Sequence, residues 1–373
     1  MAKGLFHCQQ LFGVGNLVRS LNVCRSLTQH YEIDFIHGGV DIGLTVDSPR
    51  FHKILLPPFT VDSAMRICDP YQKMSVQEIF SERKKVLDHL LLEPYDFIIT
   101  SGFPFNKHEF TQEILHIINK VKAQNPDCLV ICAQRDIASK FKDKRIGEML
   151  EIFNQYYDYV FVQSDPTILR LEDSLSFAAN IKDKTIYTGF VTQQDIGHGQ
   201  VTRLKRIIVS MGGGIVGEDL MRSVARVTPF FPQYEFLFIL GPYTNIAFVN
   251  ELESFKLNTS SSNVHLSMFL ANFTKELSQS VLSISLAGST IIDACYTHTP
   301  AIVYPFTQEQ MLRAQRFAEK GAVRMLLREQ LEPEIVKHMI SEALRTPYPD
   351  LSINCSGADN AVKALSPFIG GFS

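Results

Sequence analysis

Short apolar runs alternate with longer amphipathic stretches along almost the whole chain, and this alternation constrains the fold more than any other feature. Runs such as 97–100, 129–133 and 301–304 are largely apolar instead of alternating apolar with polar residues. A strand of this kind is buried on both faces, as happens in parallel sheets that helices cover on either side. The sequence therefore predicts an α/β protein made of βα units.

The expected strands fall into two similar sets. In the first half they lie near Leu5–Gln10, Ile33–His37, Lys53–Leu56, Phe97–Thr100, Leu129–Ala133, Tyr159–Gln163 and Thr185–Tyr187, and in the second half near Arg206–Met211, Glu235–Leu240, Val264–Ser267, Val281–Leu286, Ala301–Tyr304 and Val323–Leu326. The segment between the sets, 191–201, is polar, contains glycine and has neither the helical nor the strand period, which is typical of a linker. We therefore expect one domain over residues 1–192 and a second over 193–357. A last helix within 358–373 would lie outside the second sheet and pack back on the first domain.

Length and composition agree with two globular domains. The chain has 373 residues, of which 45% are hydrophobic and 20% charged, enough for two cores. A net charge of -3 without long basic runs argues against nucleic acid as a partner. The basic clusters at 83–85 and 140–145 are interpreted as solvated faces.

The sequence also indicates a compartment. Seven cysteines without a C-x-x-C pair are typical of reduced core thiols. The first residues lack the features of a signal peptide, and no segment has about 18 uninterrupted apolar residues. We expect a cytoplasmic protein. The apolar stretches 55–59 and 87–92 fit core packing better than peripheral contact with a membrane.

Residues 285–310 carry the most informative motif. A turn of small residues, Gly288, Ser289 and Thr290, separates an expected strand from a helix with Asp293 one turn in. Backbone N–H groups at such a turn suit a phosphate, and an acid on the helix can accept hydrogen bonds from sugar hydroxyls. The stretch predicts a nucleotide-sugar site.

A glycine loop at 212–217 follows another strand and matches G-x-G-x-x-G. A dinucleotide site also needs an acid at the end of the next strand, but the strand at 235–241 has its acid at the start and ends in Gly-Pro. A nicotinamide or flavin site is therefore disfavoured. The loop either lets a pyrophosphate approach its backbone or is a tight turn without a ligand.

In the first half, Gly13, Gly15 and Asn16 occupy the equivalent place after the first strand. Asn16 either caps a helix or contributes to the acceptor side of a cleft. Arg135 and Asp136 follow the apolar strand 129–133. Asp136 is either a general base or hydroxyl ligand, or a member of an ion pair or helix cap.

Two further observations concern a site for the planar base of a nucleotide and a site for a metal ion. Phe269 follows the strand at 264–267, where it is either a core aromatic or a platform for a planar base. The histidines show no ligand spacing, and no H-E-x-x-H, calcium-loop or Cys/His pattern occurs. We expect no tightly held metal.

These segments together resemble the nucleotide-sugar glycosyltransferases of family 28, which include the peptidoglycan-precursor N-acetylglucosaminyltransferase. The similarity is densest over 285–322, where the residues at the family's spacing are Gly288, Thr290, Asp293, Pro300, Pro305, Gln310, Ala314, Gly321 and Ala322. A narrower resemblance to a branch of bacterial glycosyltransferases covers 13–21, 102–105, 134–137, Asp165-Pro166, 187–189 and 209–220.

The resemblance implies the GT-B fold, in which two Rossmann-like doubly wound domains face each other across a cleft and the second holds the donor. Asp293 stands where the family usually has a Glu that binds the uridine ribose. The other donor positions implied are Phe269 and Leu270 for the base, Gly213, Gly214, Gly288, Ser289 and Thr290 for the diphosphate, and Glu309 and Gln310 for the sugar.

One departure concerns the acceptor side, where Asn16 replaces the family's usual histidine. An amide takes no proton at neutral pH, so Asp136 becomes the expected base. The family chemistry is displacement at the anomeric carbon with inversion, with a UDP-sugar as donor and no cofactor or obligatory metal. The acceptor, a small molecule or a lipid-linked one, stays open. Alternatives are an epimerase or hydrolase on the same scaffold, and a donor-binding subunit that needs a partner chain.

Overall fold

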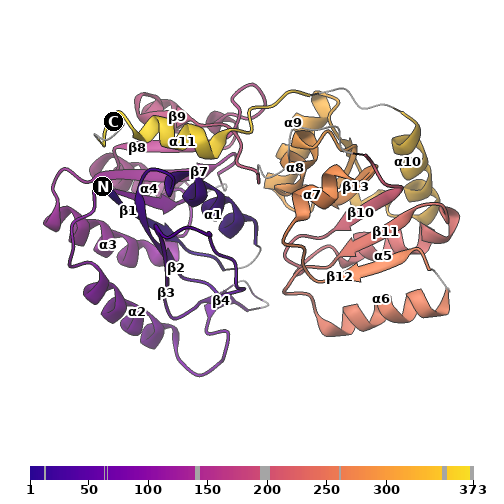
Figure 1. The fold of residues 1–373 in the computed structure, drawn as a ribbon, viewed down its shortest axis with the longest axis horizontal. Helices are drawn as coiled ribbons and strands as arrows, with labels where there is room; N and C mark the ends of the chain where they lie inside the picture. The colour runs from indigo at the N-terminus through magenta and orange to yellow at the C-terminus, as the bar shows by residue number, and fades with distance from the viewer. Residues whose placement is uncertain are drawn as a thin grey trace. The chain divides into compact units, whose positions relative to one another are not determined.

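The computed structural model describes residues 1–11, 14–62, 64, 66–138, 143–193, 202–259, 262–346 and 351–369. The chain divides into two compact units (Figure 1). The first unit comprises Met1–Phe12, Asn16–Val191 and Asn354–Ser373, and the second comprises Gly13–Gly15 and Thr192–Ile353. Each unit has its own parallel sheet with helices on both faces, which confirms the predicted α/β class.

The first sheet has the strand order β3-β2-β1-β6-β7-β8-β9, and all its neighbouring strands are parallel. The chain builds outward from β1 to β3 and then continues on the other side of β1, so the order reverses between β1 and β6. The strands are β1 (Lys3–Cys8), β2 (Glu32–His37), β3 (Phe51–Leu55), β6 (Phe97–Ser101), β7 (Leu129–Arg135), β8 (Tyr159–Gln163) and β9 (Thr185–Tyr187).

Adjacent residues of each central strand face opposite layers of helices. Leu5 and Ile98 pack with the layer of α2, α3 and α4, whereas Phe6 and Ile99 pack with that of α1 and α11. Both faces of the strands are therefore apolar, as the sequence indicated. The helices are α1 (Gly15–Leu27), α2 (Val76–Leu90), α3 (Thr111–Gln124), α4 (Asp143–Tyr156) and α11 (Gly357–Leu365).

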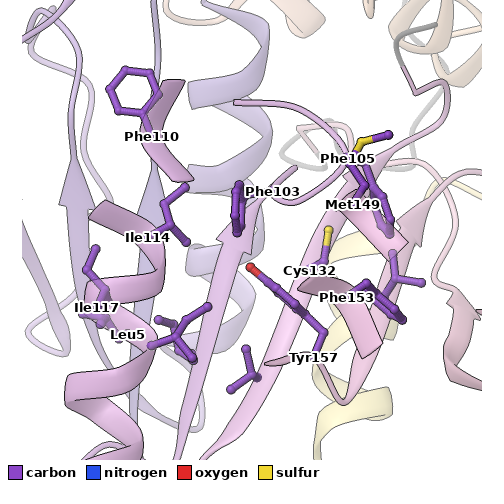
Figure 2. Close-up of a cluster of buried hydrophobic side chains, with 14 of the residues drawn as sticks. Leu5, Phe103, Phe105, Phe110, Ile114, Ile117, Cys132, Met149, Phe153 and Tyr157 are labelled. Carbon is purple, nitrogen blue, oxygen red and sulfur yellow. The ribbon is translucent and has the colours of Figure 1, made fainter. Parts of the chain in front are cut away.

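The core beneath α3 and α4 holds the loop that follows β6 (Figure 2). Phe103 and Phe105 of this loop are almost wholly buried, and Phe105 packs on Phe153 with ring centroids 5.4 Å apart. Tyr157 satisfies its buried hydroxyl through a 2.8 Å hydrogen bond shared with Thr100 Oγ1. These contacts fix the loop at the carboxyl end of β6.

The second sheet repeats the plan with the order β12-β11-β10-β13-β14-β15, reversing between β10 and β13. Its strands are β10 (Arg206–Ser210), β11 (Glu235–Ile239), β12 (Val264–Ser267), β13 (Leu282–Leu286), β14 (Ala301–Tyr304) and β15 (Arg324–Met325). One face is covered by α5 (Glu218–Val227), α6 (Ile246–Asn258) and α10 (Pro333–Arg345). The other is covered by α7 (Phe273–Ser278), α8 (Thr290–Tyr296) and α9 (Gln308–Glu319) (Figure 1).

After the second unit the chain returns to the first and adds α11 to it. The returning segment pairs with the segment that leaves the first unit: Phe190 N donates to Asn354 O at 2.7 Å, and Gly357 N donates to Phe190 O at 2.9 Å. Asp359 of α11 accepts a 2.7 Å hydrogen bond from Ser26 Oγ of α1. Thus α11 packs on the first sheet's domain. Most of the expected linker, 191–201, lies outside the described residues.

Two expected strand ends were wrong, and one hairpin was not expected. The first strand ends at Cys8, because Gln9 turns inward and its amide donates to the carbonyls of Gln10 and Gly38, both at 2.9 Å. β7 extends through Arg135, which we had placed after the strand. A short hairpin of β4 (Thr60–Val61) and β5 (Ile67–Cys68) was not expected, because two-residue strands have no period to detect.

Candidate functional site

Two backbone turns lie side by side at the carboxyl edge of the second sheet. The glycine loop 211–217 follows β10, and the turn 287–289 follows β13. β10 and β13 are paired, with Ser210 opposite Ser285, and the strand order reverses between them. In open α/β sheets such a reversal point is where ligands bind.

The glycine loop is packed backbone to backbone against the next turn of the chain. Gly214 has φ +93°, and a Cβ atom there would lie 2.2 Å from Thr244 Oγ1. Gly241 has φ +94°, and its Cβ would lie 2.3 Å from Gly212 O. Tyr243 N donates to Gly213 O at 3.0 Å. Only glycine fits at 214 and 241, so these residues fix the loop's shape.

The turn after β13 is open toward its surroundings. A Cβ atom on Gly288 would meet no atom within 4 Å. Across the described ranges, the backbone N–H groups of Ser289 and Thr290 have no hydrogen-bond acceptor, as is usual at a helix start. These N–H groups are available to an anion.

Arg313 contacts this turn, and we did not predict its role from the sequence. Its side chain is buried, and Nη1 donates to Ala287 O at 2.9 Å. The signal was its spacing: Arg313 lies four residues after Glu309 on α9, so both side chains project from one side of the helix.

Asp293 lies in the first turn of α8 and is partly buried. Burial, and then the nearby Asp293 charge, raise the pKa of the Cys295 thiol to about 12. The far end of α8 is held by Arg203, whose guanidinium donates to Thr297 O at 3.0 Å and to His298 O at 2.7 Å. Sequence reasoning missed Arg203, because its partners lie more than 90 residues away.

Phe269 follows β12 at the same edge of the sheet, with Leu270 next to it. The Phe269 residue is 37% exposed, which rules out the core-packing alternative. Ser267 Oγ donates to Phe269 O at 3.1 Å and holds the backbone of this loop.

Glu309 and Gln310 lie in the first turn of α9. Thr307 is the N-cap, and its Oγ1 accepts from Gln310 N at 3.2 Å. Phe306 N donates to Gln310 Oε1 at 2.8 Å, and this hydrogen bond assigns the amide oxygen. Because Oε1 is held, the NH₂ group of Gln310 is left to donate; it has no acceptor among the residues whose placement is described.

In the first unit, Asn16 joins α1 to the reversal point of the first sheet. Its Nδ2 donates to Cys8 Sγ at 3.6 Å, and its Oδ1 accepts from Ser101 Oγ at 2.9 Å. Asn16 lies inside α1, which begins at Gly15, so it does not cap the helix. Gly13 lies outside the described residues.

Arg135 and Asp136 form the turn that leaves β7. Arg135 Nε donates to Ile137 O at 3.0 Å, and Asp136 Oδ1 accepts from Ile137 N at 3.0 Å. Only 3% of Asp136 is exposed. The next helix, α4, begins at Asp143, so Asp136 is no helix cap.

At 83–85 the expectation of a solvated face holds for Lys84 and Lys85, whose side chains are exposed, but it is wrong for Arg83, which is fully buried. Its Nε and Nη2 each donate to the Glu113 carboxylate at 2.7 Å, and Nη2 also donates to Gln9 Oε1 at 2.7 Å. Burial opposes the ionisation of Glu113, but the His7 ring, with Nε2 3.5 Å from the carboxylate, and the hydrogen bonds from Arg83 hold its pKa at about 2. The network ties α2 and α3 to the end of β1. Much of the other cluster, 140–145, lies outside the described residues.

The described ranges contain neither a cluster of metal ligands nor a helix suited to a membrane. No group of three or more His, Cys, Asp or Glu residues in them is placed to hold a metal ion. No helix in them is both long and apolar enough to span a membrane.

Residues 207–354, nearly all of the second unit, match the glycosyltransferase family 28 C-terminal domain. The resemblance inferred from the 285–322 motif is therefore confirmed for this part of the chain. No curated protein sequence matches the chain.

The whole chain is similar in fold to several solved structures. The calicheamicin glycosyltransferase CalG4 superposes with a TM-score of 0.60 at 14% identity, covering 99% of this chain and 98% of that one. A UGT transferase from Siraitia grosvenorii in complex with UDP gives 0.59 at 12%, covering 98% and 94%. The UDP-GlcNAc 2-epimerase from Neisseria meningitidis bound to UDP-GlcNAc gives 0.58 at 16%, covering 98% and 99%. The expected GT-B fold class, with two Rossmann-like domains, is confirmed.

Proposed function

We propose that the protein is an inverting glycosyltransferase that moves a sugar from a UDP-sugar donor to an acceptor. The observation that carries this proposal is the pairing of two backbone turns, 211–217 and 287–289, at the strand reversal of a unit that matches family 28. A transferase of nucleotide sugars needs such a place for a diphosphate, and the family match supports this chemistry.

The diphosphate would lie against backbone N–H groups. Gly213 and Gly214 provide one turn and Gly288, Ser289 and Thr290 the other. Because α8 has only seven residues, we assign the stabilisation to hydrogen bonds from these turns instead of to a long helix dipole. The same donors would stabilise the charge that develops on the leaving diphosphate.

The nucleoside would lie beyond β12 and α8. We assign Asp293 to the ribose hydroxyls, and Phe269 with Leu270 to the base. The exposed ring of Phe269 supports this assignment, since an aromatic face can stack on a planar base. The UDP and UDP-GlcNAc bound in two structures of similar fold support uridine as the nucleoside.

The donor sugar would lie at the start of α9, held by Glu309 and Gln310. Gln310 presents its NH₂ group because its amide oxygen already accepts from Phe306 N. An NH₂ group fixed in this way can donate a hydrogen bond to a hydroxyl oxygen of the sugar. Glu309 complements it as an acceptor of hydroxyl protons.

For the acceptor side we assign Gly13, Gly15, Asn16 and Arg135, with Asp136 as the base. Asp136 would take the proton of the acceptor hydroxyl while that oxygen bonds to the anomeric carbon. The bond from the anomeric carbon to the diphosphate oxygen breaks in the same step, so the configuration inverts and UDP leaves.

Calorimetric titration of the full chain with UDP tests the donor site, with ADP as the comparison. We expect saturable binding of UDP and weaker binding of ADP. If no nucleoside diphosphate binds, every function that uses a nucleotide sugar would be excluded. If UDP binds but labelled donor yields no product with any acceptor class, a partner chain is required.

An epimerase or hydrolase is the second proposal, because the Neisseria epimerase shares this fold over 98% of the chain. Incubation of a labelled UDP-sugar without acceptor separates the two. An isomerised or free sugar would favour the second proposal. Donor that stays intact until an acceptor is added would favour the transferase.

A further inference from the structure

The two backbone turns of the second unit pack directly on each other. Gly217 ends the glycine loop with φ +103°, and a Cβ atom there would lie 3.1 Å from Leu286 Cδ2. Leu286 is the last residue of β13, so it comes directly before the turn 287–289. The spacing between the loop and the turn therefore depends on the residues that hold each of them.

The residue that begins the second turn is hydrogen-bonded on both sides of its backbone. Ala287 N donates to Tyr304 O of β14 at 3.3 Å, and Ala287 O accepts from Arg313 Nη1 of α9 at 2.9 Å. Tyr304 is 1% exposed and Arg313 5%, so water competes little for these groups. A hydrogen bond from a buried guanidinium is among the stronger ones in proteins. The backbone is thus fixed immediately before the N–H groups assigned to the diphosphate.

The side chain of Tyr304 reaches the other turn. Its hydroxyl donates to Asp219 Oδ2 at 2.6 Å, while Asp219 Oδ1 accepts from Leu220 N at 2.9 Å. Asp219 lies in the first turn of α5, two residues after the end of the glycine loop. Burial, and then the hydrogen bond to Asp219, raise the pKa of Tyr304 well above its ordinary value, so the phenol stays protonated and donates at neutral pH. Tyr304 therefore bonds to the second turn through its carbonyl and to the start of α5 through its hydroxyl.

The same hydrogen bond limits where a negative charge lies. Glu218 and Asp219 both belong to the first turn of α5, directly after the glycine loop. Glu218 is paired with Arg222, whose Nη2 lies 2.9 Å from Glu218 Oε2. A carboxylate that turned toward a bound diphosphate would repel it. By holding one oxygen of Asp219, Tyr304 keeps this charge at the helix start.

We propose that Tyr304 and Arg313 are positioning residues for the donor diphosphate. They hold the turn 287–289 at a fixed spacing from the glycine loop 211–217, so that hydrogen-bond donors of both turns meet the two phosphates of one nucleotide. Their role rests on the proposed function, which assigns these turns to the diphosphate of UDP. Donors that are already in place stabilise developing charge without rearranging, and a displacement of about 1 Å can lower a rate by about 10²-fold.

Calorimetric titration of the full chain with UDP and with uridine tests this role. The ratio of the two affinities measures the gain from the diphosphate, because both ligands have the same base and ribose. Tyr304→Phe keeps the ring and removes only the hydroxyl, and Arg313→Met removes the donor to Ala287 O. Each variant should lower the ratio by roughly tenfold, the factor that one charge-assisted hydrogen bond gives, and should leave the affinity for uridine unchanged.

Two further variants distinguish positioning from a merely structural role. In the first unit Tyr95 is 1% exposed, and its hydroxyl donates to Asp34 Oδ2 at 2.7 Å, so Tyr95→Phe removes a matched hydrogen bond away from the donor site. Tyr95→Phe and Tyr304→Phe should lose similar stability in thermal unfolding, but Tyr95→Phe should keep the wild-type ratio. Arg313→Lys keeps a cationic donor and should recover part of the ratio that Arg313→Met loses.

The outcomes separate the positioning role from the proposed function. If the wild type binds neither UDP nor uridine, the proposed function is excluded and the positioning role with it. If the diphosphate adds affinity in the wild type and the folded Tyr304→Phe and Arg313→Met variants keep the full gain, the positioning role is overturned and the donor site stands. Equal losses of UDP and uridine affinity would also overturn the role, since they would show a general disturbance of the site.

Discussion

Asp293 is the residue on which donor affinity depends most directly in the proposed function. Asp293→Ala should weaken UDP binding by about 1.5–3 kcal/mol, because charge-assisted hydrogen bonds to the ribose are lost. Calorimetry gives the dissociation constant, and thermal unfolding checks that the variant is folded. Thr297 Oγ1 donates to the Asp293 carbonyl oxygen at 2.9 Å, and the substitution keeps this backbone acceptor, so the helix should persist. An unchanged dissociation constant in the folded variant would contradict the assignment.

Asp136 should affect turnover and not donor binding. Asp136→Asn keeps an oxygen that can accept from Ile137 N, so the turn after β7 should survive. The amide cannot take a proton, and removal of a general base typically lowers the rate by about 10²–10⁴-fold. Steady-state kinetics with a working acceptor would measure kcat, and calorimetry the affinity for UDP. Normal turnover would dismiss Asp136 as the base.

Lys107 should make the stability of the protein depend on pH, because burial lowers the pKa of its ammonium group. Its pKa in the folded state, about 8, lies below the ordinary value of 10.5, so the folded state binds fewer protons between these values. Stability from this group therefore increases as the pH rises from about 8 to 10.5, and below that window its charge is destabilising. Lys107→Met should be more stable than wild type near pH 7 and should lack this increase. Urea unfolding across the pH range, with Lys85→Met as control, would measure both.

At the scale of elements, two glycines of the second unit should have different roles: Gly241 in the stability of the packed turns and Gly288 in the binding of UDP. Gly241→Ala places a Cβ 2.3 Å from Gly212 O at φ +94°, and strain of this kind costs about 1–3 kcal/mol. Gly288→Ala meets no atom within 4 Å, so its stability should stay within about 1 kcal/mol of wild type. We nevertheless expect Gly288→Ala to weaken UDP binding, since its methyl group would enter the diphosphate's place.

Urea unfolding and UDP titration of the two variants would check this contrast. If Gly241→Ala were as stable as wild type, the turn at Gly241 would have to move away from the glycine loop at little cost. Full UDP affinity in Gly288→Ala would move the diphosphate away from the turn at 287–289.

Elements with a clear period were predictable, and elements held by distant partners were not. β8, β9, β12 and β14 have the bounds expected from their apolar runs. Arg83 is the contrasting case: it sits in a basic run on an amphipathic helix, and its partner Glu113 lies 30 residues away on α3. The local sequence pattern does not distinguish a buried arginine from a solvated one. Arg83 can be buried only because its charge is paired with that of Glu113, and this partner is not evident from the local pattern.

The candidate site shows the same contrast. In the second unit both turns follow apolar strands directly and carry small residues, so the sequence located them. Arg203, which holds the far end of α8, is the contrasting case, because its partners Thr297 and His298 lie more than 90 residues away. Nothing in the local sequence around Arg203 indicates these partners.

At the scale of the whole molecule, the first unit is closed by a segment that follows the second in sequence. Asp165 joins the two stretches: its Oδ2 accepts from Asn354 N at 2.8 Å and its Oδ1 from Thr167 N at 2.9 Å. Asp165→Ala leaves these donors unsatisfied and should lower the free energy of unfolding by about 1–3 kcal/mol. Asp165→Asn should cost less. Urea unfolding would test the order, and a stable Asp165→Ala would refute the anchoring role.

Because α11 completes the first unit, the order of synthesis and the order of folding differ. Ala361, Val362 and Leu365 cover an apolar face that includes Phe6 and Phe35, which are made more than 300 residues earlier. While the chain emerges from the ribosome, that face stays uncovered until α11 has been translated. A nascent chain in this state exposes the kind of surface that chaperones bind. The second unit, whose described core is drawn from 207–343, can fold before the first is finished.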